Sequence, residues 1–302
     1  MNEQFLIQKY KKKIRSKQLT IENADSLSLS FIQNLEVNDL TLNNCPNINL
    51  STIPNKIKKL LLYKCDLNGV EGLGDKSELA ELTVIWNPRL KQIESIRDLI
   101  QIQRLVLYRN DIVDIKPLTK LVNITELVLN NNAIEDITAL SRLIEIQTLK
   151  LFSNKISDIW SLKKMKKLKY LDLYDNQIIE IEPIREIIRD LTFLSLDNNY
   201  ISESSISLIT DEKQEGLEFS ANEQKIPTLH IILLSFKQQV IHKHSAQINN
   251  LGNHKHRFHN CKTKETVKQI LNQQIYNYIR FIDAVKNILL NNDLVLVNAF
   301  VQ

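Results

Sequence analysis

The chain has 302 residues and nearly balanced charge, with 39 Lys and Arg against 35 Asp and Glu, and 43% of its residues are hydrophobic. This balance excludes a chain that is disordered throughout, and the length allows one to three domains. Glycine is scarce, with 5 residues, about 2% where about 7% is average, so a fold built on glycine-rich phosphate loops is disfavoured.

The cysteines and the apolar segments predict the cellular setting. Cys45, Cys65 and Cys261 are too few and too scattered for a disulfide framework, which favours a reducing compartment. Residues 1–18 lack the apolar core of a secretion signal. The longest apolar stretch, residues 226–236, is well short of the roughly 20 residues that span a membrane. We therefore expect a cytoplasmic or nuclear protein without a membrane span.

Residues 1–18 are basic, with six cationic side chains and one acidic side chain. Apolar residues are spread among them, which predicts a short amphipathic segment. We expect it to cap the region that follows through Phe5, Leu6 and Ile14.

Residues 19–226 form an internal repeat. Its core is clearest in LVLYRNDIVDIKPL, which begins at Leu105 and recurs from Leu127, Leu149 and Leu171. Degenerate copies from Leu19 and Leu217 extend the array to about ten repeats. One slot, spaced by 20 to 23 residues, holds Cys45, Cys65, Asn87, Asn110, Asn132, Asn154, Asn176 and Asn199.

This pattern resembles the leucine-rich repeat family, whose consensus places Asn or Cys in that slot. The 22-residue length and the I-x-D-I-x-P-L tail resemble the short class found in the leucine-rich regulatory subunit of protein phosphatase 1 and in internalins. The resemblance implies an α/β solenoid with a curved, parallel, concave sheet, and the pattern of the residues that follow predicts a helical C-terminal tail.

Elementary chemistry predicts the same architecture. In each Leu-x-Leu core, period-two alternation points Leu105 and Leu107 inward, and Val106 and Tyr108 outward, on a short strand. The asparagine side chain carries both an acceptor and donors, so it can satisfy backbone groups that the turn would bury. A lone repeat buries too little to fold, so neighbours must stabilise one another and the ends need caps.

Outward positions on the concave face are unusually aromatic. Tyr, Trp and Arg are common in binding hot spots, so these residues predict a surface for a partner protein. The alternative is cross-strand packing that only stiffens the sheet. The predicted binding residues are Tyr63, Trp86, Tyr108, Arg109, Phe152, Asp172, Tyr174 and Asp175.

The resemblance also bears on the partner. Phosphatase regulatory subunits of this class grip their catalytic partner through aromatic and acidic residues of the concave face, which implies that role for Tyr108, Phe152, Asp172, Tyr174 and Asp175. A phosphatase catalytic subunit is one candidate. Internalins share the arrangement, so the partner stays open.

Residues 227–302 leave the repeat register and predict a helical region with a His-rich loop. The loop and its flanks hold five of the six histidines and could bind Zn²⁺, but the spacing matches no standard zinc finger, and a solvated loop is favoured. We therefore expect no metal and no other cofactor. The candidate ligands are His242, His244, His254, His256, His259 and Cys261.

Charge separates along the chain, with basic ends around an acidic body. The basic runs 11–15 and 163–169 could contact nucleic acid or anionic lipid, but solvated surface is the favoured interpretation, and no nucleic-acid partner is expected. Trp160 lies in a turn where other repeats carry charge, so we expect it to be exposed and to offer a second, smaller contact.

Catalytic motifs are missing from the sequence, and the glycines complete no phosphate-loop pattern. We therefore predict a non-enzymatic interaction module, such as a scaffold or regulatory subunit, that binds a partner protein on its concave face. Two alternatives stay open. The repeats could target a metal-binding or catalytic tail, or the basic ends could bind nucleic acid or membrane.

Overall fold

The computed structural model describes residues 3–24, 30–212 and 215–225, and the chain divides into two units, 1–225 and 226–302. The second unit lies outside the described residues, and so do the predicted helices, the five histidines and Cys261 that it contains. The side chains of Phe5 and Leu6 lie outside them as well.

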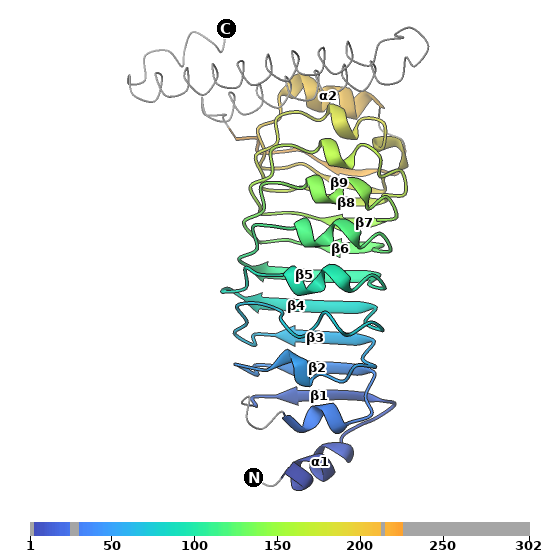
Figure 1. Ribbon diagram of the computed structural model, residues 1–302. Helices are drawn as coiled ribbons and strands as arrows, with labels where there is room; N and C mark the ends of the chain where they lie inside the picture. The colour runs from blue at the N-terminus through green and yellow to red at the C-terminus, as the bar shows by residue number, and fades with distance from the viewer. Residues whose placement is uncertain (1–2, 25–29, 213–214, 226–302) are drawn as a thin grey trace, which may run out of the picture. The chain divides into compact units, whose positions relative to one another are not determined.

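The first unit is built on one sheet of ten strands in sequence order, each parallel to its neighbours (Figure 1). Each repeat contributes one strand, as predicted, because the Leu-x-Leu core alternates with period two. The strands are β1 (Gln18–Glu22), β2 (Asp39–Asn43), β3 (Lys59–Tyr63), β4 (Glu81–Asn87), β5 (Arg104–Asn110), β6 (Glu126–Val128), β7 (Thr148–Lys150), β8 (Tyr170–Asp172), β9 (Phe193–Ser195) and β10 (Glu218–Ser220).

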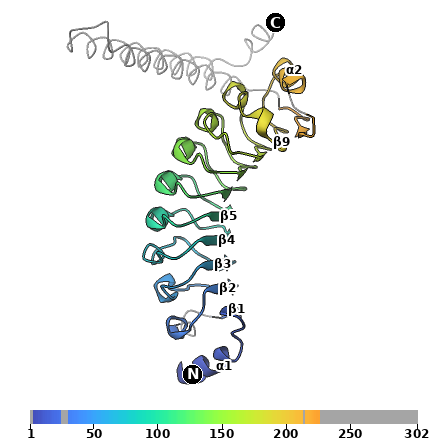
Figure 2. The same cartoon turned by 90° about the vertical axis from the view of Figure 1, so that its right-hand side faces the viewer.

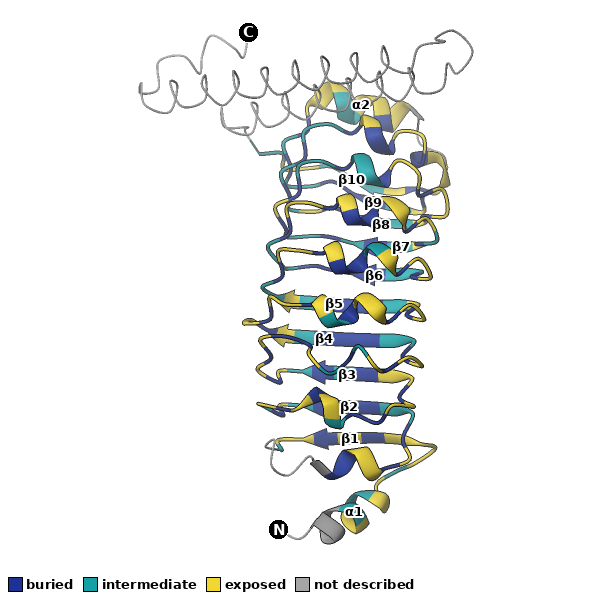
Figure 3. Ribbon diagram, viewed as in Figure 1, coloured by how far each residue is buried: buried dark blue, intermediate teal, exposed yellow. Residues whose placement is uncertain are grey.

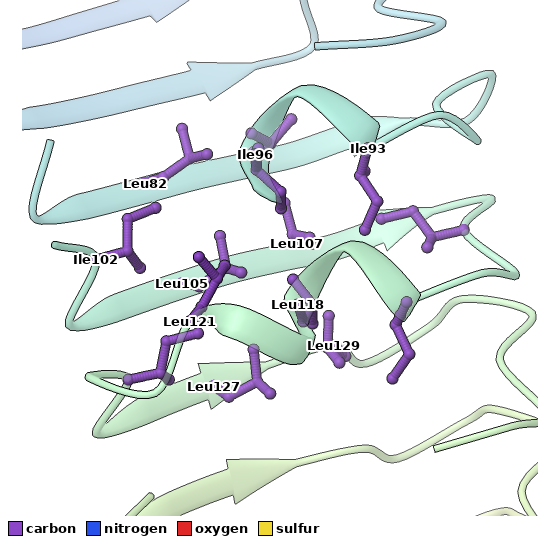
Figure 4. Close-up of a cluster of buried hydrophobic side chains, with 14 of the residues drawn as sticks. Leu82, Ile93, Ile96, Ile102, Leu105, Leu107, Leu118, Leu121, Leu127 and Leu129 are labelled. Atoms are coloured by element: carbon purple, nitrogen blue, oxygen red, sulfur yellow. The ribbon is translucent and has the colours of Figure 1, made fainter. Parts of the chain in front are cut away.

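The register places equivalent leucines side by side. Leu105 of β5 pairs with Leu82 of β4 and Leu127 of β6. Leu105 and Leu107 are completely buried, and Figure 4 shows them facing the side chains of the connecting segments, such as Ile96. The buried band runs along the whole array (Figure 3). The hydrophobic core is therefore one continuous column shared by all repeats.

The segments that return to the next strand form short 3₁₀ helices on the side opposite the sheet (Figure 2). A repeat of about 22 residues leaves little room for a longer helix between two strands. Pro117 and Pro183 suit these first turns because their missing N–H is not needed there. The helices are η2 (Ser30–Asn34), η3 (Leu50–Thr52), η4 (Glu94–Asp98), η5 (Lys116–Lys120), η6 (Thr138–Arg142), η7 (Trp160–Leu162), η8 (Glu182–Ile184) and η9 (Ile188–Asp190).

An α-helix lies near each end of the described array (Figure 1). Before the first strand, α1 (Glu3–Lys11) places Tyr10 against Phe31, with ring centroids 5.0 Å apart, and Ile14 packs against the core. After the last regular repeat, α2 (Glu203–Glu212) buries Ile209. The end repeats are thereby partly shielded from water, as a solenoid requires.

One charged residue interrupts the core. Lys76 is 0% exposed and occupies the position that Leu99 and Leu121 hold in later repeats. Its Nζ lies 2.9 Å from the Asn55 side-chain oxygen and 2.9 Å from the Asp75 carboxylate. These contacts satisfy part of the hydrogen-bonding capacity of the ammonium group and offset part of the cost of burying its charge.

Candidate functional site

The predicted Asn ladder is confirmed. Asn154 accepts a hydrogen bond from the Ile134 N–H at 3.1 Å and donates to the carbonyls of Leu129 and Leu151 at 3.0 and 2.9 Å. Ile134 and Leu129 belong to the preceding repeat, so one side chain joins two repeats. Bonds of the same kind to the preceding repeat are made by Asn87, Asn110, Asn132, Asn176 and Asn199.

The two predicted cysteines hold the same slot with weaker bonds. The Cys45 and Cys65 thiols reach the carbonyls of Ile21 and Leu42 in the preceding repeats at 3.7 and 3.5 Å. Burial raises the pKa of the Cys65 thiol to about 11, and it also raises the pKa of Cys45. Both thiols are therefore protonated packing groups.

Gln224 extends the ladder by one repeat, which the sequence pattern did not indicate. Its side-chain oxygen accepts from the Ile201 N–H, and its nitrogen donates to the Leu196 carbonyl, both at 3.0 Å. The signal that could have indicated this is the side-chain amide of Gln224 at the ladder position of the degenerate copy.

Several residues that lie between the two inward leucines of a repeat point outward but are covered by their neighbours. Val106 is only 6% exposed and Asp172 only 9%. Val106 therefore points outward as predicted but is not exposed, because parallel strands lie only about 4.8 Å apart and adjacent side chains close over a small residue. The burial of Asp172 does not fit the predicted direct contact with a partner.

Burial also raises the pKa of Asp172. Desolvation raises the pKa of its carboxyl group above the ordinary value, and the nearby Asp197 carboxylate adds to that effect. The Tyr174 N–H, 3.2 Å from the Asp172 carboxylate, and the Lys150 ammonium act in the opposite direction. The net result disfavours the charged form.

Four predicted binding residues lie two positions before the ladder slot, in what we call the aromatic column. Tyr108 and Phe152 meet edge to face with centroids 6.4 Å apart, although Asn130 separates them in the column. Asn130 is buried and accepts a bond from the Phe152 N–H at 3.0 Å. Tyr174 is 41% exposed. The column therefore combines cross-strand packing with aromatic surface open to solvent.

The position directly before the ladder slot is left-handed in every repeat, with φ between 50° and 60°. Asn and Asp tolerate this conformation better than other side chains with a Cβ, and they supply half of the positions. We call this set the left-handed column. It consists of Asn23, Asn44, Lys64, Trp86, Arg109, Asn131, Ser153, Asp175, Asn198 and Glu223.

Three consecutive repeats place large side chains in the left-handed column. Trp86 is 38% exposed, with the Lys64 Nζ 4.3 Å and the Arg109 Cζ 5.1 Å from its ring centroid. Tyr63 stacks against Trp86 at 6.4 Å, and Arg109 also lies 5.3 Å from the Tyr108 ring. We call these five residues the cationic–aromatic cluster.

The cluster borders an open hollow of about 550 Å³, lined by Lys64, Trp86, Pro88, Arg109, Asn110 and Asn131. Lys64 was not among the predicted binding residues. Its shared register with Trp86 and Arg109 was the signal that could have found it.

The cations of the cluster differ from several of those around them. Within the described residues, neither Lys64 nor Arg109 forms an ion pair, whereas four other cations of the same repeats do. These pairs are Lys59 with Glu81 at 2.7 Å, Arg89 with Asp66, Lys91 with Asp111 at 3.1 Å, and Arg104 with Glu126 at 2.9 Å.

Asp175, the remaining predicted residue, is engaged within the protein. Its carboxylate accepts from Ser153 at 3.0 Å, Asn198 at 2.6 Å and Lys225 at 2.9 Å. The structure therefore brings Tyr63, Trp86, Tyr108 and Arg109 together, while Asp175 lies in a separate network near the C-terminal end of the sheet.

The remaining predicted contact residues, Trp160 and the basic run 163–169, are partly buried or partly paired within the protein. Trp160 is half-buried, with the Lys163 Nζ 5.4 Å from its ring centroid. The 163–169 run is partly neutralised, since Lys163 and Lys167 pair with Glu186 and Glu145. Among the described residues, no group of three His, Cys, Asp or Glu side chains is placed to hold a metal ion. Within that same part of the chain, no helix is both long enough and apolar enough to cross a membrane.

Comparison with known proteins agrees with this geometry. A family model for leucine-rich repeats, in two copies, matches residues 100–142 and 144–186. No curated protein matches the chain. Residues 100–142 and 144–186 are thus leucine-rich repeats, and the described unit folds as a leucine-rich repeat solenoid.

Solved structures place the fold near the internalins. An internalin, InlF of Listeria monocytogenes, is 23% identical over 68% of this chain and 67% of that chain, with a TM-score of 0.56. Internalin C2 of the same species is 26% identical over 62% of this chain and 80% of that chain, with a TM-score of 0.50. The plant peptide hormone receptor RGFR1, solved in complex with RGF2, is 19% identical over 69% of this chain and 34% of that chain, with a TM-score of 0.51. The resemblance to a phosphatase subunit stays a prediction.

Proposed function

We propose that this protein is a non-enzymatic interaction module that binds a partner protein across the strand side of its solenoid, as a scaffold or regulatory subunit in the cytoplasm or nucleus. One observation carries the proposal. Large aromatic and cationic side chains recur on the strand side, where Trp86 and Tyr174 keep 38% and 41% of their surface open to water. Such residues dominate the energetics of protein interfaces.

The dimensions of this surface suit a protein partner. Tyr63 ends β3 and Tyr174 lies two residues after β8, and these strands are five strand intervals apart. At about 4.8 Å per interval this is about 24 Å, the width of a standard interface that buries about 800 Å² on each side. The plant peptide hormone receptor RGFR1, which has the same fold, was solved in complex with RGF2, which supports this use of the fold.

The test is capture of a partner from a lysate of the source organism by wild type and by the Tyr108→Ala/Phe152→Ala/Tyr174→Ala variant. Captured proteins are identified by mass spectrometry, and the affinity of the principal partner is then measured. We expect the variant to bind at least tenfold more weakly, because each hot-spot truncation costs about 1 kcal/mol or more.

The matched control removes exposed apolar side chains elsewhere. Ile100, Val122 and Ile144 are exposed and recur at 22-residue spacing, outside the aromatic and left-handed columns. Their triple alanine variant is expected to bind the partner like wild type. Equal capture by both triple variants would contradict the proposal.

A further inference from the structure

The left-handed column has an unusual composition in three adjacent repeats. Lys64, Trp86 and Arg109 have φ values of 52°, 60° and 55°, a conformation that costs free energy for side chains of this kind. Asn at the equivalent positions 44 and 131 would avoid part of that cost. A strained choice in three consecutive repeats indicates a role other than folding.

Contacts within the cluster organise the two cations around one exposed aromatic ring. Both the Lys64 ammonium and the Arg109 guanidinium lie within 5.1 Å of the Trp86 ring centroid. Tyr63 and Tyr108 support the cations from the aromatic column, each with its ring centroid 5.3 Å from the adjacent cation. These attractions hold the positive charges beside an apolar ring at the mouth of the hollow.

The electrostatics of the cluster leave its two cations without an anionic partner within the described residues. Neighbouring cations such as Lys91 and Arg104 are neutralised by carboxylates of the same sheet. Within the described residues Lys64 and Arg109 have no such carboxylate. Two positive groups beside an exposed indole are complementary to a carboxylate next to an apolar side chain.

We infer that the cationic–aromatic cluster recognises a short acidic segment of the partner protein. Carboxylates of Asp or Glu pair with Lys64 and Arg109, and an adjacent apolar side chain packs on Trp86. This inference rests on the proposed function, and it names the chemistry of the partner at that surface.

A nucleic-acid strand fits this surface less well. Single-stranded nucleic acid is bound along a continuous positively charged groove that follows several phosphates. Here the outward positions of the ten strands and the left-handed column together carry more acidic than basic side chains. Glu81 lies on β4, the strand that carries Trp86, and Glu126 lies on β6, the strand next to β5, so the free positive charge is local. A short acidic segment matches that extent.

The experiment uses the full chain and a displayed library of random 12-residue peptides. Trp86 and Trp160 are the two tryptophans, so a Trp160→Phe background makes Trp86 fluorescence a reporter for binding at the cluster. We expect the selected peptides to be richer in Asp and Glu than the starting library. A selected peptide should change Trp86 fluorescence, and its Asn/Gln counterpart should bind at least tenfold more weakly.

The variant Lys64→Asn/Arg109→Asn separates binding from folding. Asn suits a left-handed backbone, so the melting temperature should be unchanged or higher, while affinity for the selected acidic peptide falls at least tenfold. Lys120→Asn, which removes an exposed cation of η5 outside the cluster, should bind like wild type.

Three results would overturn the inference. They are no acidic enrichment, equal affinity of the double variant, and binding of a 12-residue oligothymidylate as tight as that of the selected peptide. The proposed function fails on a different measurement, namely undiminished partner capture by the Tyr108/Phe152/Tyr174 variant. The two failures can therefore be told apart.

Discussion

The Asn ladder makes a quantitative prediction at Asn154. Replacing Asn154 with Ala removes the acceptor of the Ile134 N–H and the donor to the carbonyls of Leu129 and Leu151. All three backbone groups lie in the buried interior, where water does not replace the lost amide.

The magnitude follows from that count. Without Asn154 the buried Ile134 N–H is left unsatisfied, which costs about 1–3 kcal/mol, whereas the Leu129 and Leu151 carbonyls keep their bonds from Asn132 and Asn176 and each lose one hydrogen bond worth about 0.5–1.5 kcal/mol. The expected loss in the free energy of unfolding is therefore about 2–6 kcal/mol. Asn123→Ala is the matched control. Asn123 is exposed and makes one bond, to the Ile100 carbonyl at 2.8 Å, so its loss should cost about 1 kcal/mol. Asn154→Cys should fall between the two, since Cys45 and Cys65 occupy the same slot.

The assay is guanidinium unfolding followed by circular dichroism, with the free energy extrapolated to water. Hydrogen exchange should show the largest loss of protection in the repeats on either side of Asn154, because stability in a solenoid is a nearest-neighbour property. If Asn154→Ala costs no more than Asn123→Ala, the ladder does not stabilise the array and the reasoning is refuted.

Three further predictions concern buried groups. The pKa of Asp172 is raised in the folded protein, so the folded protein binds the carboxyl proton more tightly than the unfolded chain does. Stability should therefore fall as the pH rises from the ordinary pKa of Asp through the raised one. Asp172→Asn should flatten this fall in melting temperature, and an unchanged pH profile of the variant would contradict the prediction. In a Cys261→Ser background, iodoacetamide at pH 8 should label Cys65 only after denaturation, because burial raises the thiol pKa to about 11. Rapid labelling of Cys65 in the folded protein would contradict this prediction. Lys76→Met should leave the melting temperature unchanged or raise it, because Met165 fills the equivalent position in a later repeat. A marked fall in the melting temperature would show that the buried ammonium group is stabilising.

Much of the fold was predictable because its rules are local and repeated. Leu105 and Leu107 show the alternation of a strand, and Asn110 shows the slot that bonds to the preceding repeat. The ten parallel strands follow once the repeat is recognised. Gln224 was missed because its copy is degenerate, although its amide makes the same bonds as an asparagine.

The sequence predicted on which side of the sheet the candidate site lies, but not which residues form it. Register places Trp86 and Arg109 on the strand side, and the structure brings them together with Lys64. Asp172 belongs to the same outward pattern, yet it is 9% exposed because side chains on adjacent strands close over it.

The amino-acid sequence by itself determined the solenoid, since recurring leucines and asparagines dictate which side chains face the core and which bond to the next repeat. Only the tertiary structure decided that Lys64 and Arg109 have no carboxylate partner among the described residues, while Asp175 is held by Ser153, Asn198 and Lys225. The physical reason is that exposure and ion pairing depend on the size and charge of neighbours about 22 residues away, and the tertiary structure brings these neighbours to within about 5 Å.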